Sequence, residues 1–185
     1  MAGSGKRRRA VLGAVVSAVA LACVGLYWFQ PWKLWTDEKV DEALPGAPAQ
    51  PRTPAAAPPG GSAAAPAGPR TLAEGGLISH EHTTTGTARI VQLPDGSRTL
   101  RLEGLDTSNG PDLRVWLTDA PVKEGVAGWR VFDDGKHLSL GKLKGNKGDQ
   151  NYPIPAEVQL ADYTSVTIWC DRFDVSFGAA ELRRT

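Results

Sequence analysis

One uninterrupted apolar segment, Ala10–Phe29, constrains the fold of this chain more than any other feature. It has twenty residues without a charged side chain, which is long enough for a helix to cross the hydrocarbon core of a bilayer. The basic run Lys6–Arg9 precedes it, and acidic residues follow between positions 37 and 42. Basic residues tend to stay on the cytoplasmic side. The sequence therefore predicts a single-pass protein of the cell membrane, with residues 1–9 in the cytoplasm and the C-terminal part outside it.

Two alternatives for this segment stay open, namely a cleaved signal peptide and a lipoprotein anchor. Ala20-Leu21-Ala22 offers the small residues of a cleavage site, and Cys23 follows directly. The apolar run nevertheless continues to Phe29, beyond the point where a mature chain normally becomes polar. Aromatic residues then cluster between Tyr27 and Trp35, as they do at a membrane interface. We therefore favour an uncleaved transmembrane anchor at residues 10–29.

Shifts in composition divide the rest of the chain into three parts. Residues 30–44 form an aromatic and acidic juxtamembrane segment, and residues 45–75 form a linker that holds eight of the fourteen prolines. Such a composition cannot offset the entropy lost when a core is ordered. In an extended conformation, the proline-rich part would reach roughly 80 Å at about 3.1 Å per residue. We expect a tether between the membrane and a β domain at residues 76–183.

The β domain is expected from short alternating segments separated by turns. Gly86–Leu93 and Arg98–Glu103 flank a Pro-Asp-Gly-Ser turn and predict a hairpin, in which Arg101 faces outward. Leu113–Thr118 alternates in the same way, whereas the glycine-containing stretch Lys142–Tyr152 is typical of a loop. No long helical period is present. The expected fold class is all-β, a small antiparallel β-sandwich or a partly closed barrel.

A strand pair between Ser165 and Leu182 closes this domain and contains a single thiol. In an extended strand, Cys170 shares one face with the aliphatic residues before it, while Trp169 points to the other face. Arg172 would lie on the same face as Cys170 if the strand continued. Cys23 is the other cysteine, in the apolar segment, so no disulfide is expected within one chain.

Several motifs in this part of the chain resemble one known family. They are, in order, Gly110-Pro111-Asp112 before a strand, the glycine-rich stretch from Gly141 to Tyr152, Ser165–Cys170, and Phe173–Leu182. Together they are similar to the DM-thirteen domain, an extracellular module of Skeletor-type proteins that also occurs in bacterial membrane proteins. The resemblance covers residues 76–182 and implies a redox or electron-transfer role through Cys170, in a bacterial cell envelope.

The residues themselves leave two interpretations of Cys170 open. A reactive thiol needs exposure or an electropositive neighbour, whereas a buried cysteine acts as a small hydrophobic residue. His80-Glu81-His82 places two imidazoles on one face of a strand, but an isolated motif of this kind is usually solvated, so no metal is expected. The chain has no G-x-S-x-G or H-E-x-x-H motif, so we do not expect a hydrolase. No cofactor can be named.

The alternative function is a non-catalytic binding or structural module of the cell envelope. From Gly76 onward the chain has 13 Lys or Arg and 15 Asp or Glu, and this balance argues against a nucleic-acid partner. The partner would be a redox partner in one case and a cell-envelope component in the other. The candidate binding residues are aromatic or belong to the glycine-containing motifs: Trp116, Trp169, Gly110, Pro111, Asp112, Gln150 and Tyr152. Both tryptophans either fill a second core or line an aromatic cleft.

Overall fold

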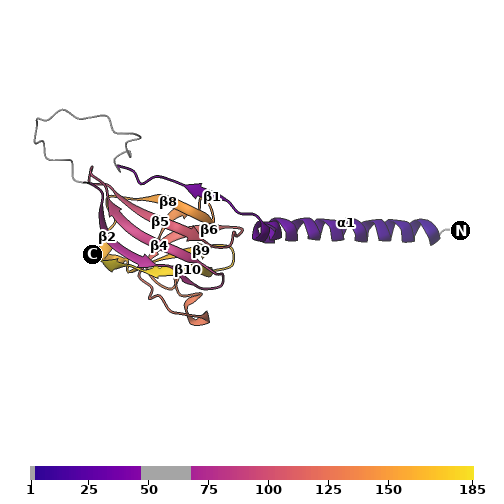
Figure 1. Ribbon diagram of the computed structural model, residues 1–185. Helices are drawn as coiled ribbons and strands as arrows, with labels where there is room; N and C mark the ends of the chain where they lie inside the picture. Colours follow the sequence, from indigo (N-terminus) through magenta and orange to yellow (C-terminus); the bar gives the residue numbers. More distant parts are fainter. Residues whose placement is uncertain (1–2, 47–67) are drawn as a thin grey trace, which may run out of the picture.

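An N-terminal helix projects from one end of a two-layered β domain in the computed structural model of the chain (Figure 1). The structure describes residues 3–46 and 68–185. Helix α1 (Gly3–Phe29) is long and apolar enough to cross a membrane, and its side chains from Arg7 onward are almost all exposed. A 3-10 helix, η1 (Pro31–Trp35), follows at once. The single N-terminal helix expected from the sequence is confirmed.

Two sheets form the β domain, and the expected β-sandwich is confirmed. The six-stranded sheet has the order β1-β8-β5-β4-β2-β11, and the five-stranded sheet has the order β3-β10-β9-β6-β7. The strands and their bounds are β1 (Lys39–Asp41), β2 (Arg70–Gly76), β3 (Ile78–Ser79), β4 (Thr85–Gln92), β5 (Arg98–Asp106), β6 (Leu113–Thr118), β7 (His137–Lys142), β8 (Lys147–Ile154), β9 (Ser165–Cys170), β10 (Val175–Glu181) and β11 (Arg183–Arg184). Only the β1–β8 pair is parallel among the described strands.

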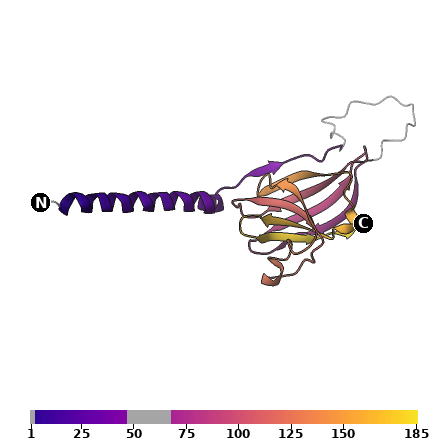
Figure 2. The ribbon, with the colours of Figure 1, turned by 180° about the vertical axis from the view of Figure 1, so that it is seen from behind.

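The main core lies between the sheets, and both views of the ribbon show the two layers (Figure 2). It is built from alternate residues of the central strands, as the period of two in the sequence predicts. Its members include Leu100 and Leu102 of β5, Val115 and Leu117 of β6, and Val166 of β9. A smaller second core covers the outer face of the five-stranded sheet.

The two ends of the β domain differ in their position relative to α1. The anchor pole is the end next to α1 and consists of the connections 80–84, 107–112, 143–146 and 171–174. The far pole is the opposite end and contains the hairpin turn 93–97 and the chain terminus. Strand β9 runs toward the anchor pole and β10 runs away from it.

Two expectations about the six-stranded sheet were wrong. The stretch expected as a loop up to Tyr152 contains most of β8, because β8 pairs with β5 from Lys147 onward. Arg101 was expected to face solvent but is only 7% exposed. Its guanidinium donates to Glu103, to Asp149 and to the Glu42 carbonyl of the juxtamembrane segment. A segment distant in the sequence therefore covers this arginine.

The sheet also extends beyond the boundary that the composition indicates. The expected boundary at residue 76 is the last residue of β2, and β1 lies within the juxtamembrane segment 30–44. Independent folding of residues 76–183 stays a prediction. Strand β10 has a bulge at Phe177, which shifts the alternation of its side chains by one residue. Val175 and Phe177 point into the main core, and the next residue to do so is Ala180.

Candidate functional site

Cys170 is the last residue of the central strand β9, at the anchor pole. It pairs with Leu113 of β6 on one side and with Val175 of β10 on the other. Its exposed fraction is 0%, and it belongs to the main core. The Phe173 N–H donates to the Cys170 carbonyl at 3.2 Å, which starts the tight connection to β10. The thiol is therefore sealed beneath a four-residue turn.

The surroundings of this thiol favour its neutral form. Burial raises the pKa of Cys170, because a thiolate loses its hydration in an apolar site. The backbone amides of Arg172, Phe173 and Asp112 act in the opposite direction but do not cancel this effect. Arg172 does not supply the positive charge that an extended strand would have placed beside the sulfur. The strand ends at Cys170, and the guanidinium of Arg172 donates to the Tyr27 carbonyl of α1 at 3.2 Å.

The structure places the binding candidates Gly110, Pro111 and Asp112 next to Cys170, in the connection that leads into β6. The Asp171 N–H donates to the Asp112 carbonyl at 3.0 Å, so the two connections are joined directly above the end of β9. A Cβ atom on Gly110 would be 3.0 Å from Phe177 Cζ and from Leu113 Cδ2. A larger residue here would have to displace these two core side chains by a few tenths of an ångström.

A group of charged side chains surrounds the Asp112 carboxylate. Arg114 lies 3.4 Å from it and Lys142 lies 3.8 Å from it, while Arg114 Nε is also 3.0 Å from Asp171. Asp112 Oδ1 is buried and has no hydrogen-bond partner within the described chain. A cavity of about 90 Å³ opens here, lined by Gly110, Pro111 and Asp112 together with residues of the 143–146 connection. The anchor pole thus combines a shielded thiol with a polar cavity.

A family model described as Electron transfer DM13 matches residues 76–182. The match covers more than half of the chain and includes Cys170 and the motifs around it. This chain belongs to the DM13 electron-transfer family. No curated protein and no solved structure matches the chain. Strand β1 and most of β2, which complete the six-stranded sheet, lie before the matched residues.

The two candidate tryptophans of the DM13 domain lie in the second core, on the face of the five-stranded sheet opposite to the Cys170 side chain. Trp116 and Trp169 stack with ring centroids 5.1 Å apart and are 6% and 1% exposed. His137 stacks on the outer side of Trp116 at 4.4 Å, and Phe132 meets Trp169 edge-on at 6.4 Å. Of the two alternatives for these tryptophans, the structure has the second core.

Gln150 and Tyr152 of the DM13 domain form a buried hydrogen-bonded unit. The Tyr152 hydroxyl donates to Gln150 Oε1 at 2.7 Å, and Gln150 Nε2 donates to the Gly145 carbonyl at 2.6 Å. The Lys144 N–H donates to both side chains. Burial raises the pKa of Tyr152 to about 12, so its hydroxyl keeps its proton. These side chains hold the 143–146 connection in place from inside the sandwich.

The two histidines of the His80-Glu81-His82 motif have separate environments. His80 Nδ1 lies 2.7 Å from the Ser176 hydroxyl and Nε2 lies 3.0 Å from the Lys123 carbonyl, so both ring nitrogens are occupied. His82 packs against Phe177 with centroids 4.0 Å apart and the ring planes tilted by 33°. Burial lowers the pKa of both histidines. Within residues 3–46 and 68–185, no group of three or more His, Cys, Asp or Glu is placed to hold a metal ion.

Sequence reasoning missed Asn146, which links the DM13 domain to the segment that follows α1. Asn146 is 1% exposed; its Nδ2 donates to Asp37 at 2.7 Å and to the Thr107 carbonyl at 2.8 Å. Its Oδ1 accepts from the Glu38 N–H at 2.7 Å. An asparagine between glycines in a polar stretch carries no periodic signal, so only the fold reveals this role.

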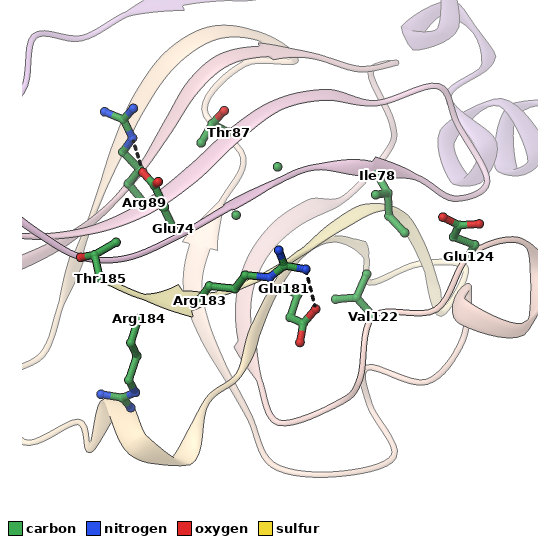
Figure 3. A pocket seen from close by; sticks show the side chains of 12 residues that line it. Glu74, Ile78, Thr87, Arg89, Val122, Glu124, Glu181, Arg183, Arg184 and Thr185 are labelled. Carbon is green, nitrogen blue, oxygen red and sulfur yellow. Dashed lines mark ion pairs between the residues drawn. The ribbon is translucent and has the colours of Figure 1, made fainter.

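A groove on the edge of the six-stranded sheet contains none of the predicted site residues. It has a volume of about 660 Å³ and lies where β2, β11 and the connection after β6 meet. Figure 3 shows the charged side chains around it, with ion pairs between Arg89 and Glu74 and between Arg183 and Glu181. Cys170 does not line this groove.

Proposed function

We propose that α1 holds the DM13 domain on the outer side of the cell membrane, where the domain takes part in electron transfer through Cys170. Family membership carries this proposal, because the matched residues 76–182 contain Cys170 as their sole cysteine. The order of the basic run, the apolar helix and the acidic segment supports an N-terminus in the cytoplasm.

The burial of Cys170 is consistent with a shielded redox group in an oxidising compartment. A lone exposed thiol there forms intermolecular disulfides or is oxidised to sulfenic acid. Since burial raises the pKa of Cys170, rapid thiol–disulfide exchange in the closed state is disfavoured. The connections 107–112 and 171–174 are joined above the end of β9 and shield the thiol there.

Protein-film voltammetry of the full chain in a supported bilayer tests the redox role. The wild type should give a redox wave that Cys170→Ala abolishes. Cys23→Ala is the matched control, because Cys23 is the other free cysteine and is exposed on α1. A wave that persists in Cys170→Ala, or no wave in the wild type, would refute a role for Cys170 in electron transfer.

Protease treatment of intact cells tests the orientation separately. Cleavage should remove the DM13 domain from the outside of the cell, since the domain follows the helix in the sequence. Protection of the domain until the membrane is permeabilised would reverse the proposed topology.

A second candidate function is a non-catalytic binding or structural module, and the complete burial of Cys170 favours it. The predicted binding residues that retain exposure are Pro111 and Asp112, beside the cavity at the anchor pole. In this case Asp112→Asn should abolish cosedimentation with isolated envelope material. Cys170→Ala should leave cosedimentation unchanged, and the reverse pattern would contradict a binding module.

A further inference from the structure

The proline-rich segment does not separate the anchor from the β domain, because both of its ends belong to the far pole. Before it, Gly46 approaches the hairpin turn so closely that a Cβ atom there would be 2.9 Å from Pro94 Cδ. After it, Arg70 begins β2 and pairs with Gln92. Figure 1 shows these points at the end of the domain opposite α1. The chain therefore reaches the sheet before the proline-rich segment begins.

Direct contacts join the end of α1 to the anchor pole. Arg172 donates to the Tyr27 carbonyl, and its guanidinium lies over the Trp28 ring at 5.1 Å from the ring centroid. Phe173 stacks on Phe29 with centroids 5.8 Å apart. A positive side chain at the last carbonyls of a helix is also favourable for the helix dipole.

The segment after α1 is held by the same pole. Lys33 Nζ donates to the Gly110 carbonyl at 3.1 Å, and Asn109 Nδ2 donates to the Thr36 carbonyl at 3.3 Å. Both contacts involve the 107–112 connection, which also covers Cys170. The short η1 therefore leaves no free length between the helix and the domain.

Strand β1 completes the attachment, and two glycines of the DM13 match make room for it. A Cβ atom on Gly145 would be 2.4 Å from the Glu38 carbonyl oxygen, and one on Gly148 would be 2.1 Å from the Val40 carbonyl oxygen. Gly148 also has a φ of +95°, which disfavours other residues. The glycine-rich stretch around Gly145 and Gly148, which resembles a simple turn in the sequence, is thus the surface against which β1 packs.

We propose that the DM13 domain is clamped against the bilayer surface by this attachment, with the anchor pole and Cys170 facing the lipid headgroups. The inference rests on the proposed membrane anchoring. Trp28, Phe29, Trp32 and Trp35 are about half exposed or more and lie beside the same pole. Such side chains prefer the headgroup level. The bilayer surface is therefore the partner that the anchor pole fits.

Neutron reflectometry of the full chain in a supported bilayer tests this arrangement. The clamped domain should lie directly on the headgroups, without a water layer between them. A domain on an extended tether would leave a water-filled gap of up to roughly 80 Å. Such a gap in the wild type would overturn the proposal. Loss of the chain on washing with high salt would instead show that α1 does not insert, which is a failure of the anchoring.

Two glycine variants test the part that β1 plays. Gly145→Ala should displace Glu38 and open a water gap, whereas Gly76→Ala should not, since no atom lies within 4 Å of a Cβ at that position. Near-ultraviolet circular dichroism of both variants checks that the sandwich is retained. A folded Gly145→Ala protein whose neutron reflectivity matches that of the wild type would contradict the role of β1 in the clamp. A gap in Gly76→Ala would contradict it equally.

Discussion

The anchor pole and the far pole of the β domain are closed by different kinds of contact. At the anchor pole, buried side chains such as Asn146 and Thr84 bind backbone groups that are distant in the sequence. At the far pole, the hairpin turn is closed by its own backbone, with the Leu93 N–H donating to the Ser97 carbonyl at 2.8 Å. The hairpin turn of the far pole is therefore a local structure, whereas the anchor pole depends on contacts across the chain.

The buried polar contacts of Asn146 and Thr84 therefore lie at the same end of the domain as Cys170. A buried polar group that loses its partner costs about 1–3 kcal/mol, whereas an exposed turn can bond to water instead. Substitutions at the anchor pole should consequently destabilise the protein more than those at the far pole. The measurement in each case is urea unfolding of the full chain in detergent micelles, followed by near-ultraviolet circular dichroism.

The largest effect is expected for Asn146→Ala. The substitution leaves the Glu38 N–H and the Thr107 carbonyl without their buried partner, so the free energy of unfolding should fall by roughly 3 kcal/mol. Asn109→Ala is the matched control at the same pole, where the side chain is only half-buried, and it should cost at most about 1 kcal/mol. Equal losses for the two variants would show that the burial of Asn146 adds nothing to its contribution to stability.

Cys170 should give the next largest effect. Cys170→Ala should cost about 1–2 kcal/mol through a small cavity. Cys170→Ser should cost about 2 kcal/mol or more, because a hydroxyl is less favourable than a thiol in an apolar site. A Cys170→Ser protein as stable as the wild type would show that the end of β9 is polar, contrary to its burial.

At the far pole, Gly96→Ala should cost about 1 kcal/mol, through backbone strain alone. Gly96 has a φ of +85°, and no atom lies within 4 Å of a Cβ there. Gly76→Ala has the same open space without a positive φ and is the control for adding a methyl group. The alkylation rate of Cys170 in Gly96→Ala should equal that of the wild type. A faster rate would indicate that the two poles are coupled.

The sequence predicts the regular part of this molecule well because regular strands repeat every two residues. Val166, Ile168 and Cys170 all lie in the main core, and Trp169 lies in the second core, as alternation requires. The bulge at Phe177 in β10 breaks the period, and only the neighbouring Gly178 hints at it, since a glycine within a strand often marks a bulge. The single helix follows from length and polarity alone.

The candidate site was harder to predict because its parts come from contacts across the chain. Gly110–Asp112 and Cys170 do meet, but Gln150 and Tyr152 turn inward to support a connection. Residues 39–41 are three exposed or half-buried positions with no strand signal of their own, and the partner β8 makes them a strand. The pairing of β1 with β8 also explains the burial of Arg101, because it brings Glu42, directly after β1, over the Arg101 guanidinium.

The smallest effect is expected from acidification, through His80 beside the anchor pole. Burial lowers the pKa of His80 from its usual value of about 6.5. The unfolded chain therefore takes up a proton before the folded chain does. The stabilisation is fully present above pH 6.5 and is lost as the pH falls from there through the lower pKa of the folded state.

This loss should be modest because the hydrogen bonds of His80 can reverse. A protonated ring can donate to Ser176, whose hydroxyl lies 2.8 Å from Thr167, and Thr167 can donate to the Gly178 carbonyl. His80→Gln should flatten the dependence of the unfolding free energy on pH below 6.5, while the exposed His137→Gln should leave most of it in place. Burial also lowers the pKa of His82, so a remainder should persist in His80→Gln and disappear when His82→Gln is added. If the unfolding free energy falls equally steeply with pH in the wild type and in His80→Gln, another group causes the pH dependence.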